Sequence, residues 1–212
     1  PDDKIKTYLN VRNLKDEDYV NNNYIVLGTK RGIIKKTSLE AYSRPRANGV
    51  IAITVRDGDE LLDAVLTNGN SEILLAGRNG RCCRFDESDA RALGRTASGV
   101  RGIDVGEGVA VGMEITAESE DVLVVTEKGY GKKTNIDQYR MTHRGSKGVK
   151  GLNVTEKNGN LISARAVNGD EDLMIITDSG IIIRLPLSQV SSTGRVAQGV
   201  KLINLKDNQK VS

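Results

Sequence analysis

Residues 172–184 read D-L-M-I-I-T-D-S-G-I-I-I-R: an apolar run, a polar turn that ends in glycine, and a second apolar run that ends in arginine. This order is typical of a β-hairpin, in which two antiparallel strands flank a tight turn. The pattern occurs four times, with turn glycines at Gly32, Gly80, Gly129 and Gly180. Their spacings of 48, 49 and 51 residues indicate an array of blades or a solenoid.

Each repeat is predicted to contain four short strands, which is the composition of a propeller blade. The expected strands are 5–11, 24–29, 33–37 and 50–55; 61–66, 73–77, 81–85 and 100–105; 109–115, 122–126, 130–134 and 149–154; and 161–167, 173–177, 181–185 and 200–205. The fold class is therefore all-β, a propeller-like disc in one domain, 1–212, with repeats at 2–57, 58–106, 107–157 and 158–206. Residues 207–212 are expected to begin a further strand, and the insertion at 12–23 to form a surface loop.

Composition narrows the class of protein further. The chain has 212 residues, 38% hydrophobic and 28% charged, which is ordinary for a globular protein, and its apolar runs are too short to span a membrane. The polar start without Met suggests a piece cut from a longer chain. Cys82 and Cys83 are adjacent in a predicted strand, so we expect them on opposite faces, as reduced packing residues in a reducing, cytoplasmic compartment.

Charge is distributed unevenly along each repeat. A second repeated element centres on Gly-Val pairs at 49/50, 99/100, 148/149 and 199/200. The segments considered are the hairpin tips, 28–36, 77–84, 127–133 and 178–184, and the loops around the Gly-Val pairs, 43–50, 94–101, 143–150 and 194–201. Together they comprise 63 residues with 20 of the 31 Lys and Arg but only 2 of the 28 Asp and Glu. These segments carry a net charge of +18, and the rest of the chain carries −15. Because equivalent positions recur in every blade, we expect a continuous basic belt.

The belt is predicted to contact phosphates. Its members are Lys30, Arg31, Lys35, Lys36, Arg44, Arg46, Arg78, Arg81, Arg84, Arg95, Arg101, Lys128, Lys132, Lys133, Arg144, Lys147, Lys150, Arg184, Arg195 and Lys201. Lys and Arg interchange between repeats, which favours contact with phosphates over reading of bases. With 1 Phe, 6 Tyr and no Trp, the chain is poorly supplied for stacking on single-stranded bases. Duplex DNA bound without sequence preference fits best.

No enzymatic site is predicted. His143 is the only histidine and has no recognisable catalytic partner, so we expect no catalytic residue, no metal site and no cofactor. The glycine-rich stretch 145–151 does not have the order of a P-loop. Tyr42 and Tyr139 occupy equivalent positions and are predicted to pack between strands.

At T-S-L-E-A-Y-S-R-P-R-A-N-G-V-I-A-I (37–53) and A-S-G-V-R-G-I (97–103), the chain closely resembles the C-terminal domain family of DNA gyrase A, from the type IIA topoisomerases. The resemblance covers all four repeats. It implies a β-pinwheel, a disc whose neighbouring blades exchange strands and whose basic rim bends duplex DNA. It further implies that this non-catalytic domain presents DNA for ATP-dependent strand passage and negative supercoiling, with the breakage-reunion part of the same gyrase polypeptide and the ATPase component, gyrase B, as partners.

The chain departs from that family at one motif. The gyrase-A box, of type Q-[KR]-[KR]-G-G-[KR]-G, does not occur, and residues 143–151 are only a degenerate relative of it. We therefore expect DNA binding without wrapping. The alternatives are the C-terminal domain of topoisomerase IV and, from another class, a protein-binding propeller of the WD or kelch type. Because segment 28–36 carries +4 and segment 178–184 carries 0, reversing Lys35 and Lys36 is expected to weaken DNA binding more than reversing Arg184.

Overall fold

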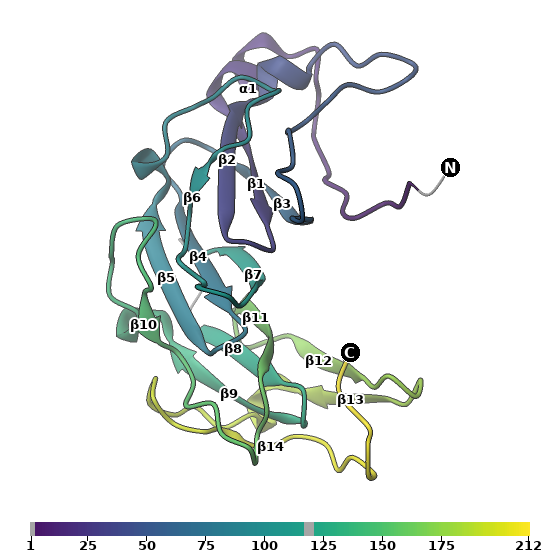
Figure 1. Ribbon diagram of the computed structural model, residues 1–212, viewed down its shortest axis with the longest axis vertical. Helices are drawn as coiled ribbons and strands as arrows, with labels where there is room; N and C mark the ends of the chain where they lie inside the picture. The colour runs from purple at the N-terminus through teal and green to yellow at the C-terminus, as the bar shows by residue number, and fades with distance from the viewer. Residues whose placement is uncertain (1–2, 117–120) are drawn as a thin grey trace.

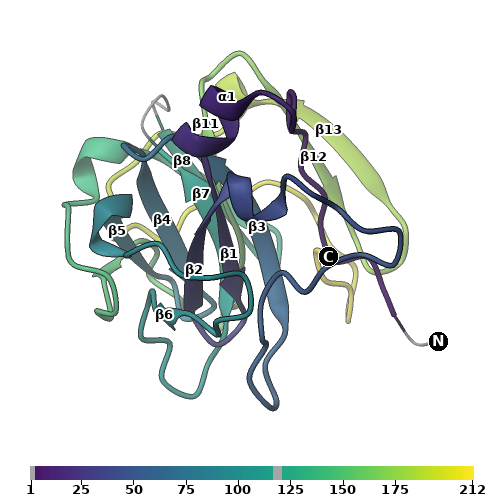
Figure 2. The same cartoon turned by 90° about the horizontal axis from the view of Figure 1, so that it is seen from above.

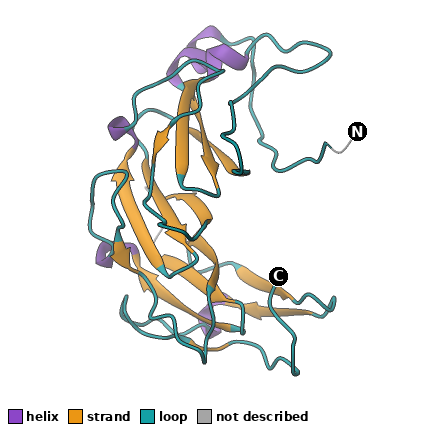
Figure 3. Ribbon diagram, viewed as in Figure 1, coloured by secondary structure: helices purple, strands orange, loops and turns teal. Residues whose placement is uncertain are grey.

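The computed structural model describes residues 3–116 and 121–212. Antiparallel sheets follow one another along an arc, with both chain ends on its concave side (Figures 1 and 2). Short helices lie along the outer side of the arc (Figure 3). The predicted all-β, propeller-like fold is confirmed.

The elements in chain order are α1 (Glu17–Asn22), β1 (Tyr24–Thr29), β2 (Ile33–Ser38), the 3₁₀ helix η1 (Leu39–Tyr42), β3 (Leu61–Thr67), β4 (Glu72–Gly77), β5 (Arg81–Asp86), η2 (Glu87–Asp89), β6 (Val100–Arg101), β7 (Ala110–Ile115), β8 (Asp121–Thr126), β9 (Tyr130–Asn135), η3 (Ile136–Gln138), β10 (Val149–Lys150), β11 (Leu161–Val167), β12 (Asp172–Ile176), β13 (Ile182–Pro186), η4 (Leu187–Gln189) and β14 (Val200–Lys201).

Each complete sheet combines strands from two successive repeats. The first sheet has the order β3-β1-β2-β6, in which the hairpin β1–β2 belongs to one repeat and the flanking strands β3 and β6 belong to the next. The second and third sheets repeat this arrangement as β7-β4-β5-β10 and β11-β8-β9-β14. Exchange of strands between neighbouring blades is thus confirmed.

The fourth hairpin, β12–β13, forms a two-stranded sheet in the described chain. The strands expected to complete it, 161–167 and 200–205, pair instead with β8 and β9 of the third sheet. Val211 forms a single antiparallel bridge with Thr177 at the end of this hairpin. The expectation of four strands in every blade is therefore wrong for the fourth.

The hairpin turns explain why glycine recurs. Gly80 has a φ of +82°, a left-handed conformation that only glycine adopts freely. Its N–H closes the turn on the carbonyl of Gly77 (2.9 Å), and its own carbonyl accepts hydrogen bonds from the N–H groups of Gly151 (2.7 Å) and Leu152 (3.1 Å). The carbonyl of Gly32 accepts in the same way from Gly102 and Ile103. These turns are therefore also docking points for the following repeat.

This docking shortens the strands that follow the Gly-Val pairs. The predicted strands 100–105, 149–154 and 200–205 are two residues long in the structure. After two paired residues the chain turns across the tip of the neighbouring hairpin, where Ile103 and Leu152 become buried. The length predicted from apolar composition was wrong because those apolar residues pack over a turn and do not extend a sheet.

Two predicted strands do not form. Residues 5–11 and 50–55 contain no strand, and Ile5 and Ile51 are 91% and 62% exposed. Equivalent segments of the later repeats pair with the hairpin of the preceding repeat, and no hairpin precedes β1 among the described residues. The insertion at 12–23 is also more ordered than a loop, because it contains the helix α1.

The core lies between neighbouring sheets. Cys82 packs with Leu74 of its own sheet and Val122 of the next, whereas Cys83 packs with Ile34 of the preceding sheet. Because the two cysteines pack in different clusters, the prediction that they face opposite sides is confirmed. Both thiols are free. Burying each large apolar side chain stabilises the fold by about 1.5–3 kcal/mol. On the concave side β7 contacts both β3 and β11.

Substitution of two glycines can show how much the docking contact contributes to stability. Gly80 and Gly180 share a φ of +82°. A Cβ at Gly80 would lie 2.7 Å from the Leu152 carbonyl oxygen, whereas one at Gly180 meets no atom of the described chain within 4 Å. Gly180→Ala should cost about 1–3 kcal/mol for its left-handed backbone alone. Gly80→Ala should lower the urea midpoint further, because the Leu152 backbone must also move. Equal losses would contradict the docking role.

Candidate nucleic-acid interface

The outer edge of the arc carries a row of basic loops, which we call the basic rim: residues 94–101, 143–150 and 194–201. These loops end in the edge strands β6, β10 and β14, which lie on the convex side, while β3, β7 and β11 lie on the concave side (Figure 1). The rim therefore follows the curve of the molecule. The equivalent segment of the first repeat, 43–50, projects away from this row at the upper right of Figure 1.

Successive loops of the basic rim are hydrogen-bonded to one another. Gly145 N–H donates to the Gly102 carbonyl (2.6 Å), and Asp104 N–H donates to the Ser146 carbonyl (2.9 Å). The Arg195 guanidinium donates to the carbonyl of Lys150 in the loop before it. These contacts make the rim a continuous band whose loops hold one another in place.

Exposed cations occupy the same register position in each edge strand. Arg101 pairs with Ile33, Lys150 with Arg81 and Lys201 with Tyr130, each opposite the first residue of a hairpin's second strand. All three cations are exposed. The exposed members of the predicted set are Lys30, Arg31, Arg44, Arg46, Arg78, Arg101, Lys128, Lys147, Lys150, Arg184 and Lys201.

Some exposed cations are partly neutralised at the hairpin tips. Lys30 forms an ion pair with Glu60 (2.5 Å), and Arg78 forms one with Glu127 (3.6 Å). Lys128 donates to the carbonyl of Glu156. Exposed ion pairs of this kind are weak, so these cations retain the ability to exchange partners.

The basic residue four places after each turn glycine has a structural role in three of the four hairpins. The buried Lys36 pairs with Glu87 of the next repeat (3.2 Å). Arg84 binds Glu72 and the carbonyls of Ile136 and Tyr139, again in the next repeat. Arg184 binds Asp172 across its own hairpin. Lys133 is half-buried.

Lys35 and Lys132 are interior residues with 0% exposure. Burial lowers the pKa of each to about 8, and Arg95 and Arg195 respectively add to the effect. Charge reversal at Lys35 and Lys36 would therefore place carboxylates in the protein interior. The comparison with charge reversal at Arg184, which the sequence suggested, would measure folding and not contact with DNA.

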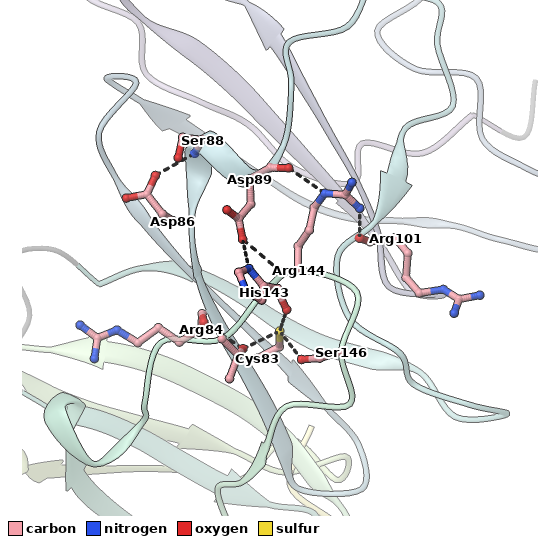
Figure 4. Close-up of polar contacts among 10 residues, drawn as sticks. Cys83, Arg84, Asp86, Ser88, Asp89, Arg101, His143, Arg144 and Ser146 are labelled. Carbon is pink, nitrogen blue, oxygen red and sulfur yellow. Dashed lines mark hydrogen bonds and ion pairs between the residues drawn. The ribbon is translucent and has the colours of Figure 1, made fainter.

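Half-buried arginines brace the rim. Arg144 Nε donates to the Asp89 carbonyl (2.8 Å) and Nη1 to the Arg101 carbonyl (3.0 Å), so it connects its loop with two segments of the preceding repeat (Figure 4). Arg81 donates to the carbonyls of Lys147 (3.1 Å) and Gly148 (2.8 Å). Arg95 and Arg195 are the residues equivalent to Arg144 in loops 94–101 and 194–201, and both are half-buried.

His143 shows no catalytic arrangement. Its side chain is 96% exposed, with Nδ1 3.5 Å from Asp89 (Figure 4). Cys83 lies beneath the same loop, with Sγ 3.3 Å from Ser146 Oγ and 3.4 Å from Thr142 Oγ1. Within residues 3–116 and 121–212, no group of three or more His, Cys, Asp or Glu converges as a metal site would. In the same ranges, no helix has the length and apolarity needed to cross a bilayer.

Three exposed arginines beside the basic rim were missed by the sequence reasoning. Arg91 and Arg140 each precede a residue that bridges to a hairpin strand, Ala92 and Met141. Their equal repeat position was the signal that could have identified them. Arg56 donates to the carbonyl of Gly99 (3.2 Å), which lies in loop 94–101.

Comparison with known proteins was made on sequence and on structure. The family described as "DNA gyrase C-terminal domain, beta-propeller" matches residues 23–68, 71–116, 120–168 and 171–212. DNA gyrase A of Staphylococcus epidermidis is 47% identical over 214 aligned positions, and that of Staphylococcus aureus is 46% identical. Each alignment covers 100% of this chain and 24% of the relative, so the chain spans about a quarter of their length.

Two solved structures share the arrangement of blades. A DNA gyrase A C-terminal domain matches with a TM-score of 0.81 and 25% identity over 90% of this chain and 64% of that one. The C-terminal domain of a DNA topoisomerase IV matches with a TM-score of 0.84 and 25% identity over 90% and 60%. The two structures are equally similar in fold, and the sequence relatives at 46–47% identity distinguish between them. The chain belongs to the DNA gyrase C-terminal domain family.

Proposed function

We propose that the chain binds duplex DNA along the basic rim, without sequence preference, and bends it around the outer edge of the arc. The observation that carries this proposal is the equal register of Arg101, Lys150 and Lys201 on successive edge strands, in loops that are hydrogen-bonded into one band. Evenly repeated point charges suit phosphates, which carry no sequence information. A curved row of them suits a bent duplex.

The wider role follows from membership of the family. In this proposal the chain is the C-terminal domain of a DNA gyrase A polypeptide and presents a DNA segment to the breakage-reunion part of that polypeptide. Gyrase B would supply ATP hydrolysis, and the assembly would introduce negative supercoils in the bacterial cytoplasm. The matches of 46–47% to gyrase A proteins, along the whole chain, favour this role over that of topoisomerase IV.

The site requires no reaction chemistry from this chain. Cys82 is buried, and burial raises the pKa of its thiol to about 12, so it stays protonated at physiological pH. Burial also raises the pKa of the Tyr139 hydroxyl, which keeps that side chain neutral. A WD-type or kelch-type role would place the partner on the faces of the disc, whereas the cations gather on its edge.

Binding should weaken with salt in proportion to the phosphates contacted. If about five to eight phosphates are neutralised, log K against log salt should have a slope of roughly −4 to −7. Fluorescence anisotropy with duplexes of unrelated sequence measures both slope and preference. Binding that does not respond to salt, or that depends strongly on one sequence, would contradict the proposal.

Cations of the rim should matter more than the cation of the last hairpin. Lys150→Ala and Lys201→Ala should each weaken binding to all sequences and reduce the salt slope by about 1. Arg184→Ala is the matched control, because Arg184 is also exposed but is paired with Asp172. A larger effect of Arg184→Ala would place the DNA path over the hairpin tips.

The chain alone should bind DNA without strong wrapping. Bending 20–30 base pairs through 40–90° costs about 1–6 kcal/mol, which contacts along the whole path must offset. No gyrase-A box occurs here to add a denser basic loop. We expect little change in linking number when nicked circles are sealed with the chain bound and then deproteinised. A strong shift of one sign would refute this expectation.

A further inference from the structure

Lys35 and Lys132 occupy the same place in their repeats, three residues after the turn glycines Gly32 and Gly129. Each lies on the second strand of a hairpin and has 0% exposure. Removing an ammonium group from water is costly, so the protein has to supply partners for it. Neither lysine forms an ion pair with a carboxylate of the described residues.

The partners of Lys132 are backbone carbonyls of the basic rim. Nζ donates to the oxygens of Gly194 (2.7 Å) and Arg195 (2.5 Å), the first two residues of loop 194–201. With its carbonyl held inward, Arg195 directs its guanidinium to the neighbouring loop. Lys201, at the end of the same loop, remains exposed.

Lys35 makes the equivalent contacts one sheet earlier. Its Nζ donates to the carbonyls of Gly94 (3.4 Å) and Arg95, the first two residues of loop 94–101. It also donates to the carbonyl of Ala52, which accepts a further hydrogen bond from the Tyr42 hydroxyl (3.0 Å). One ammonium thus joins three segments that are far apart in the sequence.

The other two repeats serve as an internal comparison. The equivalent residue of the second hairpin is Cys83, and the loop above it is held by Arg144 through two carbonyls of the preceding repeat. The equivalent residue of the fourth hairpin is Ile183, and no basic loop lies over that hairpin in the described part of the chain. A buried lysine is therefore present where a loop beginning Gly-Arg has to be held.

An ammonium group is well suited to this position. Carbonyl oxygens that face the interior need donors, and an ammonium offers three N–H groups in charge-assisted hydrogen bonds. The pKa of both lysines, lowered to about 8 by burial, leaves them charged at pH 7 and neutral above pH 9. A neutral amine keeps only two N–H groups, so Lys35 could no longer donate to three carbonyls.

We propose that Lys35 and Lys132 are positioning residues for DNA binding, whose buried ammonium groups hold loops 94–101 and 194–201 in the shape that presents their cations to phosphates. They do not contact DNA. This inference rests on the proposed function and adds to it the reason why the rim is ordered before DNA arrives.

The test compares Lys132→Met with Lys201→Met in the full 212-residue chain. Both changes remove one charge from an unbranched side chain, one beneath the loop and one on it. Lys201→Met should reduce the salt slope by about 0.9, for one phosphate, and leave amide exchange in loop 194–201 unchanged. Lys132→Met should accelerate exchange in that loop and raise the Kd for a random duplex by at least about tenfold.

The outcomes separate the two hypotheses. A Kd that Lys132→Met leaves unchanged overturns the positioning role alone. Accelerated exchange throughout β8 and β9 would show a general packing role and also overturns it. Absence of duplex binding by the unmodified chain overturns the proposed function, and the positioning role with it.

A pH titration provides a second measurement that does not depend on how the variants fold. The groups facing Lys132 are Cys82 and Arg195, and those facing Lys35 are Arg95 and Tyr42. Burial raises the pKa of Cys82 to about 12 and that of Tyr42 above its usual value, so both stay neutral near pH 8. DNA affinity of the unmodified chain at constant ionic strength should fall between pH 7 and pH 9, and that step should be absent from the Lys35→Met, Lys132→Met double variant.

The free energy of unfolding should rise with pH over part of the range in which the DNA affinity falls. Between pH of about 8 and 10.5 the folded chain binds fewer protons at these lysines than the unfolded chain, so their cost to stability is relieved as the pH rises. The unmodified chain should therefore gain stability relative to the double variant while its affinity declines. Affinity and stability that fall together would overturn the proposal.

Discussion

The carbonyl of the turn glycine in each of the first three hairpins, which accepts two N–H groups from the next repeat, is the contact on which the array depends. At Gly80 these donors are Gly151 and Leu152, and the same contact occurs at Gly32 and Gly129. It sets where the chain leaves the short edge strand and buries an apolar residue over the turn. A blade is therefore completed only when the following repeat has folded onto it, which makes neighbouring blades cooperative.

The same contact determines which charged side chains are exposed on the outer edge. Because the edge strand is only two residues long, its second residue is always exposed and its loop always returns along the outer edge. Arg101, Lys150 and Lys201 occupy that exposed place. Cations nearer the middle of the hairpin, such as Lys36 and Arg84, face the next repeat and are bound by carboxylates and carbonyls. Within one repeat, then, some basic residues build the band and others lie on its surface.

The hairpins were predictable because their signal is local: a glycine is required in the left-handed position of each turn, and apolar runs flank it. The assignment of strands to sheets was not, since spacing alone does not show that β3 and β6 join the hairpin of the preceding repeat. The burial of Lys35 was equally hidden, because the carbonyl of Arg95 that it binds lies 60 residues away. The same is true of the basic rim: the sequence showed where its loops lie along the chain but not which of their basic residues are buried and which are exposed.

The hydrogen-bonded succession of loops has an evolutionary consequence. Every junction in the array uses the same two surfaces, a hairpin turn and the segment that crosses it, as Gly80 with Leu152 illustrates. Duplication or loss of one internal repeat would leave each remaining junction unchanged in kind. Such an event would lengthen or shorten the curved row of loops by one blade and a fixed set of cations, so that descendants could differ in the extent of their basic rim without having to evolve a new interface.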